Sequence, residues 1–272
     1  MAKYQFGFIG CGNMGGALVR AISAQVPAEH ILIADRIANN TEQLQAQCGV
    51  CVAADAAQVA QEAQYIFLGV KPQGMRALLT ELSDLLKSRQ DRFVLISMAA
   101  GITLSSLQEM LNFPNTAIIR ILPNTPAAVG KGMTLYCCNS CVTAEEEHTV
   151  VQALMAAGNV DCLDEGLIDA GCAISGCGPA FVYLFMEALA DGGVAAGLPR
   201  QKALMYAAQT VIGAAETLMQ SGKHPGELKD AVCSPGGSTI QGVIALEDGA
   251  FRSDVIQAVL AAYEKTRELG NK

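Results

Sequence analysis

The first part of the chain alternates short apolar runs with stretches in which apolar residues recur every three or four positions. The apolar runs begin near residues 4, 31, 49, 65, 93, 117, 132 and 160, and each is typical of a buried strand. The periodic stretches between them are typical of helices that bury one face. Because strands and helices take turns along the chain, we expect a mostly parallel sheet with helices on both faces.

A glycine turn joins the first predicted strand to the first predicted helix, which begins at Met14. Gly10, Gly12 and Gly15 have the G-x-G-x-x-G spacing. In a dinucleotide site, the first glycine allows the sharp turn, the second admits the pyrophosphate and the third lets helix and strand pack closely. The N–H groups at the start of the helix then face the phosphates. We therefore predict a doubly wound Rossmann sheet that binds NAD(P); a glycine turn without a ligand is the alternative.

Two charged residues end the second apolar run. Asp35 follows Gly15 at the distance where a Rossmann carboxylate accepts a hydrogen bond from the ribose 2′-hydroxyl of NAD. Arg36 comes next and could instead hold the 2′-phosphate of NADP. The two side chains favour different cofactors, so the sequence predicts NADPH or NADH without choosing between them. The alternative is that Asp35 only begins a turn.

Polar residues also follow two later strands, at the edge of the sheet where ligands of doubly wound folds bind. Lys71 is either a cofactor contact or a solvated strand end. Asn124 is either a polar contact or part of an Asx turn. Pro72 is expected to stop the strand that begins at Tyr65, because proline lacks the N–H that a sheet needs.

The periodicity changes after the last predicted strand. From Leu167 onward, long alanine-rich helical stretches replace the strand-like runs, and they are apolar nearly all round. We therefore predict two domains, a dinucleotide-binding domain over residues 1–165 and an all-helical domain over residues 166–272. Because so much apolar helix surface needs a cover, we expect a homodimer through the helical domain. A compact monomeric bundle is the alternative.

A second glycine loop, Ser-Pro-Gly-Gly-Ser-Thr, ends at Thr239 and precedes another predicted helix. Ser238 and Gln241 have the spacing of a capping box, and Gly236 and Gly237 clear the approach to the helix N-terminus. Such a helix start can bind a small anion such as a carboxylate, and the hydroxyl of Thr239 can reach the ligand's other polar atom. A capped loop without a ligand is the alternative.

Composition narrows the class of partner. The chain has 272 residues, 51% of them apolar, and a net charge of −8, which argues against nucleic acid as a partner. We see no signal peptide and no uncharged apolar run of the ~18 residues that a membrane helix needs, so we expect a cytoplasmic protein without a membrane partner. The two C-x-x-C pairs among the 10 cysteines begin at Cys48 and Cys138, too far apart for a compact zinc site. We therefore expect no metal.

Five motifs, in order along essentially the whole chain, resemble those of pyrroline-5-carboxylate reductase, which performs the last step of proline biosynthesis. They lie at residues 70–73, 97–101, 120–126, 175–180 and 234–239, and the Ser-Pro-Gly-Gly-x-Thr motif is the most specific. The resemblance implies a Rossmann domain, a helical domain that interlocks with a partner, and dimers that can assemble further. It also implies that NAD(P)H donates hydride to the C=N carbon of a small cyclic imine carboxylate.

The resemblance also supplies site residues, which join those already named. The predicted cofactor-binding residues are Ile9, Gly10, Cys11, Gly12, Asn13, Met14, Gly15, Asp35, Arg36, Gly69, Val70, Lys71, Pro72, Ala100 and Asn124. The predicted substrate-binding residues are Glu165, Ser234, Gly237, Ser238 and Thr239. Thr239 is the predicted catalytic residue, because its hydroxyl would hydrogen-bond the ring nitrogen during hydride transfer.

Two alternative functions remain at this point. A hydroxyacid dehydrogenase of related architecture begins with the same glycine loop, but it uses a catalytic lysine on a helix after the Rossmann domain, and residues 180–196 contain no lysine. A non-catalytic NAD(P)H-sensing module would bind the cofactor without oxidising it when the cyclic imine is added.

Overall fold

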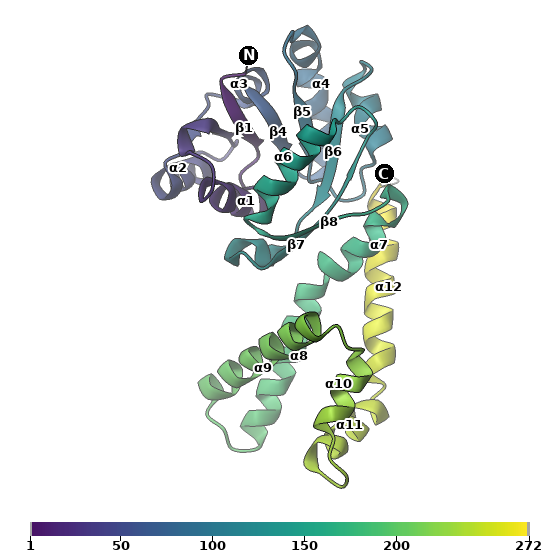
Figure 1. Cartoon of the computed structure of the whole chain (residues 1–272). Helices are drawn as coiled ribbons and strands as arrows, with labels where there is room; N and C mark the ends of the chain where they lie inside the picture. Colours follow the sequence, from purple (N-terminus) through teal and green to yellow (C-terminus); the bar gives the residue numbers. More distant parts are fainter. Residues whose placement is uncertain (1, 271–272) are drawn as a thin grey trace. The chain divides into compact units, whose positions relative to one another are not determined.

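The protein is described by a computed structural model that covers residues 2–270 (Figure 1). The chain forms two compact units. Met1–Cys177 and Ala262–Lys272 make up the first, and Gly178–Ala261 makes up the second. The second unit is therefore inserted into the first along the sequence. The domain ranges expected from the sequence, 1–165 and 166–272, stay a prediction.

An eight-stranded sheet forms the centre of the first unit. Its strands are β1 (Tyr4–Ile9), β2 (Ile31–Ala34), β3 (Cys51–Val52), β4 (Ala63–Leu68), β5 (Val94–Ser97), β6 (Ala117–Leu122), β7 (Gly132–Cys138) and β8 (Gly158–Cys162). They lie in the order β3-β2-β1-β4-β5-β6-β7-β8. Only the β6–β7 pairing is antiparallel among the described strands. The first six strands follow the Rossmann order, so the predicted fold is confirmed.

Helices cover both faces of this sheet (Figure 1). They are α1 (Asn13–Ser23), α2 (Ala38–Cys48), α3 (Ala56–Glu62), α4 (Pro72–Ser88), α5 (Leu104–Leu111), α6 (Ala144–Met155) and α7 (Glu165–Ser175), with short 3₁₀ turns η1 (Ala28–His30) and η2 (Thr125–Val129). Neighbouring residues of β4 explain the two layers. Phe67 packs with Phe8 and Leu18 on one face, whereas Ile66 packs with Leu79 and Leu107 on the other. Side chains alternate along a strand, so an unbroken apolar run serves both layers.

The end of β4 differs from the sequence expectation. The strand ends at Leu68, before Pro72, and Pro72 instead occupies the start of α4. Proline suits the first turn of a helix because the N–H that it lacks would have no partner there. Residues between Leu68 and Pro72 are thus released from the sheet as a loop, which is where several predicted cofactor contacts lie.

The second unit contains helices and no strand among its described residues. These helices are α8 (Gly178–Ala195), α9 (Arg200–Ser221), α10 (Pro225–Val232), α11 (Ser238–Asp248) and most of α12 (Phe251–Gly270), whose last part belongs to the first unit. Large apolar side chains are exposed on all five of them, including Leu184 of α8 at 69%, Met205 of α9 at 59% and Ile256 of α12 at 58%. This exposure agrees with the expectation that the helices have apolar surface left to bury.

One stretch, Glu165–Ala195, is long and apolar enough to cross a membrane by length and composition alone. The sequence expectation of no membrane span considered only uncharged runs, whereas this stretch carries four acidic residues, Glu165, Asp169, Glu187 and Asp191. Charged side chains are costly inside a bilayer. The stretch is also divided between α7 and α8. Its exposed apolar surface is equally suited to contact with another protein chain.

Candidate active site

The glycine turn after β1 is a close backbone crossing rather than an ordinary turn. Gly10 has φ +95°, and a Cβ there would lie 2.7 Å from the carbonyl of Gly69. A Cβ on Gly15 would clash with the Gly10 carbonyl oxygen. At Gly12, by contrast, a Cβ would meet no described atom within 4 Å. A dinucleotide site requires close packing at the first and third glycines and open space at the second, and Gly10, Gly15 and Gly12 meet these requirements. These residues therefore fit a bound pyrophosphate.

The start of α1 is free to receive that pyrophosphate. Gly12 is the N-cap residue and has no side chain to cap the helix, and the first turn carries no acidic residue. The first N–H groups of a helix lack partners inside the helix and carry the positive end of its dipole. Asn13 is exposed and Met14 half-buried, so both border this open space. Ile9 and Cys11 are buried, so their side chains are covered by the protein itself.

The carboxylate of Asp35 binds the glycine loop directly. Its Oδ2 accepts a hydrogen bond from the Cys11 N–H at 2.6 Å, and its Oδ1 accepts one from the Ile37 N–H at 2.8 Å. The Arg36 side chain is exposed and makes no hydrogen bond or ion pair with the described residues. Burial, and next the charge of Asp35, raise the pKa of the Cys11 thiol to about 12. Cys11 is therefore a neutral thiol at physiological pH.

The loops after β4 and β5 complete this edge of the first unit. The Gly69 N–H donates to the Ile9 carbonyl at 2.7 Å, which joins the ends of β1 and β4. Val70 follows, and Lys71 is exposed at the N-cap of α4. Ala100 is half-buried in the loop after β5. Because β1, β4 and β5 are parallel neighbours, their carboxyl ends present these loops side by side. Contact of each residue with the cofactor stays a prediction.

Asn124 is held by two hydrogen bonds within the protein. Its Nδ2 donates to the carbonyl of Ser175 at 2.8 Å, and its Oδ1 accepts from the N–H of Met133 at 2.9 Å. The side chain therefore ties the loop after β6 to the end of α7 and to β7. This structural role was not expected from the sequence, which offered a cofactor contact or an Asx turn.

Glu165 belongs to a charge cluster around a buried arginine that the sequence did not reveal. Arg120 of β6 is fully buried, and its Nη2 lies 2.5 Å from Asp169 Oδ1 on α7. Its Nη1 lies 3.7 Å from Glu165 Oε1. The same Glu165 oxygen accepts a hydrogen bond at 2.6 Å from the N–H of Leu104, the first residue of α5. The only hint in the sequence was one arginine inside an otherwise apolar strand.

The second glycine loop lies in the second unit and is closed by its own backbone. The Gly237 N–H donates to the Ser234 carbonyl at 3.0 Å, and Gly236 has φ +68°. Helix α11 begins at Ser238 with Gly237 as N-cap and no side-chain cap. The predicted capping box of Ser238 with Gln241 is therefore wrong, because Ser238 is already helical. The uncapped N–H groups are instead available to an anion, with Ser234, Ser238 and Thr239 exposed around them.

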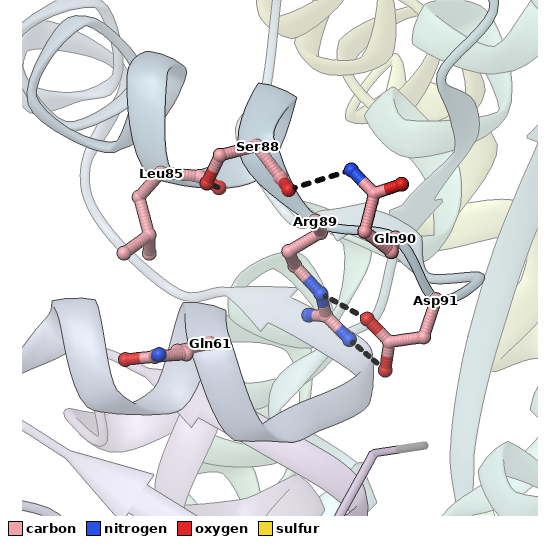
Figure 2. A pocket seen from close by; sticks show the side chains of 6 residues that line it. All are labelled: Gln61, Leu85, Ser88, Arg89, Gln90 and Asp91. Carbon is pink, nitrogen blue, oxygen red and sulfur yellow. Dashed lines mark hydrogen bonds and ion pairs between the residues drawn. The ribbon is translucent and has the colours of Figure 1, made fainter.

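A pocket elsewhere in the first unit is not part of this arrangement. It is lined by Gln61, Leu85, Ser88, Arg89, Gln90 and Asp91 (Figure 2). These residues lie at the ends of α3 and α4, at the edge of the sheet opposite the glycine loop. The Arg89 guanidinium already binds Asp91 and the carbonyls of Ala60 and Ala63. It therefore closes the end of α3 and has little capacity left for a ligand.

The described residues contain no group of three or more His, Cys, Asp or Glu side chains that could hold a metal ion. All ten cysteines are free thiols. Burial raises the pKa of several of them, to about 11 for Cys172 and about 12 for Cys138. These thiols are neutral at physiological pH and behave as small apolar side chains.

Two family models match the chain. Residues 165–269 match pyrroline-5-carboxylate reductase dimerisation, and residues 5–101 match NADP oxidoreductase coenzyme F420-dependent. The first match covers the helical region and the second covers the glycine loop, Asp35 and the loops after β4 and β5.

Individual proteins match over nearly the full length. Pyrroline-5-carboxylate reductase of Arabidopsis thaliana is 42% identical over 98% of this chain and 96% of its own length. The enzyme of that name from Escherichia coli K12 is 41% identical over 97% of this chain and 98% of its own length. The crystal structure of Plasmodium falciparum pyrroline carboxylate reductase with NADP bound has a TM-score of 0.87, 32% identity and 99% coverage of both chains.

Proposed function

The chain belongs to the pyrroline-5-carboxylate reductase family, and we infer from this membership how its residues divide the work of the reaction. The protein is an NAD(P)H-dependent oxidoreductase that reduces the C=N bond of 1-pyrroline-5-carboxylate to give proline. The observation that best supports a cofactor site in this chain is the crossing of Gly10, Gly15 and Gly69 beside the open position at Gly12. Neither a hydroxyacid dehydrogenase nor a sensing module agrees with the family.

The first unit holds the cofactor in this proposal. The N–H groups at the start of α1 bind the pyrophosphate, and Asp35 and Arg36 lie on the side of the adenosine ribose. The loops that contain Gly69, Val70, Lys71, Pro72 and Ala100 receive the nicotinamide half, and Asn124 keeps the neighbouring loop in place. The bound NAD(P)H supplies the hydride.

The second glycine loop binds the substrate carboxylate. The N–H groups that open α11 and the hydroxyls of Ser234 and Ser238 surround that anion, and Gly237 leaves room for it. The hydroxyl of Thr239 hydrogen-bonds the ring nitrogen. Glu165 contributes a carboxylate that favours the protonated imine, whose carbon accepts hydride more readily. Because protonation of an imine is easy in water, the protein mainly aligns the two rings.

The test of this assignment is substitution of Thr239, read as oxidation of NADPH on addition of 1-pyrroline-5-carboxylate. We expect Thr239→Ala to lower kcat/KM about tenfold or more, because one polar hydrogen bond to the reacting nitrogen is lost. Thr239→Ser keeps the hydroxyl and is the matched control, expected to retain most of the activity. If Thr239→Ala turns over like the unmodified enzyme, the catalytic assignment is wrong, although the activity itself would stand.

The exposed helices of the second unit support a further proposal about assembly. The chain carries a dimerisation domain, and we propose that it forms a homodimer through the apolar faces of α8, α9 and α12, with larger assemblies built from dimers. The same pairing accounts for the apolar stretch at Glu165–Ala195 without a membrane. A cytoplasmic location is likewise our proposal.

A further inference from the structure

We propose that Arg120 is a positioning residue, which holds the Glu165 carboxylate at the nicotinamide end of the cofactor site so that one oxygen stays bound and the other faces the substrate. This rests on the role given above to Glu165. Arg120, Asp169, Glu165 and Leu104 all lie in the first unit, as do the contacts between them.

Arg120 is placed to act on α7 and on nothing outside the protein. It is fully buried in β6, between Ser97 of β5 and Cys137 of β7. A buried guanidinium is tolerated only with partners of opposite charge. Both partners, Asp169 and Glu165, lie on α7, one helical turn apart. The strand thus fixes the first turn of α7 by charge rather than by apolar packing alone.

The two carboxylates are held differently. Asp169 has the short contact, 2.5 Å, with Nη2 of Arg120. Glu165 lies farther from Arg120, with its Oε1 at 3.7 Å, and the same Oε1 atom accepts the hydrogen bond from the Leu104 N–H. The Glu165 side chain is 32% exposed, and no described residue donates a hydrogen bond to its Oε2. One oxygen is therefore anchored, whereas the other is free to meet a ligand.

The anchoring atom places Glu165 beside the cofactor loop. Leu104 opens α5 directly after the loop that contains Ala100. That loop follows β5, a neighbour of β4 in the part of the sheet where parallel strand ends carry the cofactor loops. Arg120, Glu165 and Leu104 hence form a continuous link from the buried sheet to this loop. A small shift of Glu165 would change its distance to a substrate stacked on the nicotinamide, and rates are sensitive to such shifts.

The experiment compares Arg120→Lys with Glu165→Gln, alone and combined, in the full-length enzyme. Lysine keeps the charge but lacks the planar fork that serves two carboxylates at once. We expect each single substitution to lower kcat about tenfold, with the Kd for NADPH changed less than about twofold. The double variant should lose no more than about tenfold, because Arg120 acts through Glu165.

Arg89→Lys is the matched control. Arg89 is a second buried arginine of the first unit, paired with Asp91 at the opposite edge of the sheet (Figure 2). The substitution Arg89→Lys should lower the melting temperature without changing kcat, and this loss of stability should be the same whether residue 165 is Glu or Gln.

Three results would count against the idea in distinct ways. Losses that multiply to about a hundredfold in the double variant would make Arg120 a structural residue independent of Glu165. An unchanged kcat in Arg120→Lys, beside an impaired Glu165→Gln, would remove the positioning role alone. An unchanged kcat in Glu165→Gln would overturn the substrate role of Glu165 and the positioning role with it, while leaving the Thr239 assignment intact.

Discussion

Both carboxylate oxygens of Asp35 accept hydrogen bonds from backbone N–H groups, and one of these groups, the Cys11 N–H, lies in the glycine loop itself. A carboxylate used in this way shapes the loop before any cofactor binds, and it has less capacity for a ribose 2′-hydroxyl. Arg36, one residue later, is exposed and unpaired among the described residues. Arginine binds phosphate through charge-assisted hydrogen bonds. We therefore propose that NADPH is the preferred cofactor, a choice that the sequence alone left open.

Arg36→Gln tests this preference. Loss of the charge should lower kcat/KM for NADPH about tenfold or more and leave kcat/KM for NADH nearly unchanged, because only NADPH carries the 2′-phosphate. Arg20→Gln removes another exposed arginine, near the far end of α1, and should change neither value. Steady-state kinetics with both cofactors measures the ratio. An equal loss of kcat/KM for NADH and NADPH would show that Arg36 does not bind the 2′-phosphate.

The contacts of single residues were also the features that the sequence predicted least well. Glycine spacing found Gly10, Gly12 and Gly15 because backbone geometry leaves few substitutes at a close crossing. Arg120 was missed because one polar residue in an apolar strand has no periodicity to detect. Its partners on α7 are distant in sequence, and no local sequence pattern indicates that they contact Arg120. The structural hydrogen bonds of Asn124 were missed for the same reason.

Among the elements, α11 owes its proposed anion site to the residue at which it begins. Gly237 is the N-cap, in extended backbone with φ −74°, and a Cβ there would lie 2.5 Å from Ser234 Oγ. The glycine is therefore kept for space rather than for an unusual backbone angle. A side chain at this position would displace Ser234, one of the groups proposed to surround the substrate carboxylate.

Gly237→Ala should consequently raise KM for 1-pyrroline-5-carboxylate several-fold and leave the Kd for NADPH unchanged. Gly242→Ala, in the same helix, adds the same methyl group where no described atom lies within 4 Å, and it serves as the control. Kinetics with varied substrate and a separate cofactor titration distinguish the two steps. Wild-type substrate affinity in Gly237→Ala would contradict the assignment of this loop.

Most elements of the first unit were predictable because strand runs and helix periods differ so clearly in its sequence. The boundaries were less predictable where two signals competed. Pro72 was expected to stop a strand but begins α4, since the crossing of Gly69 with Gly10 had already ended β4. Ser238 was expected to cap α11, but the helix starts one residue earlier than that pattern requires.

For the whole molecule, the second unit carries apolar side chains that its own helices do not cover. Burial is worth about 25 cal/mol for each Å² of apolar surface removed from water, so the exposed faces of α8, α9 and α12 are a strong drive to association. The sequence indicated this excess of apolar helix surface. It could not show which side chains remain exposed once the unit has folded.

Leu184→Asp tests the proposed dimer. Leu184 is 69% exposed on α8, and a charge there would have to be buried without a partner in an apolar interface. We expect dissociation at concentrations where the unmodified protein is dimeric, measured by sedimentation or light scattering. Val129→Asp adds the same charge at a residue 76% exposed in the first unit, and it should leave the dimer intact. A dimeric Leu184→Asp protein would place the interface elsewhere.

The polypeptide passes between the two units twice, leaving the first after Cys177 and re-entering it at Ala262. A protease that cuts only the first passage would leave the inserted helices covalently joined to the end of α12, and a cut in only the second would leave them joined to the first 177 residues. In both cases non-covalent packing of the end of α12 within the first unit would hold the two fragments together, so a nicked molecule would still migrate as a single species under native conditions. Only cleavage of both passages would free the inserted helices as a separate fragment, and the first unit would then retain the end of α12 as a peptide held without a covalent bond.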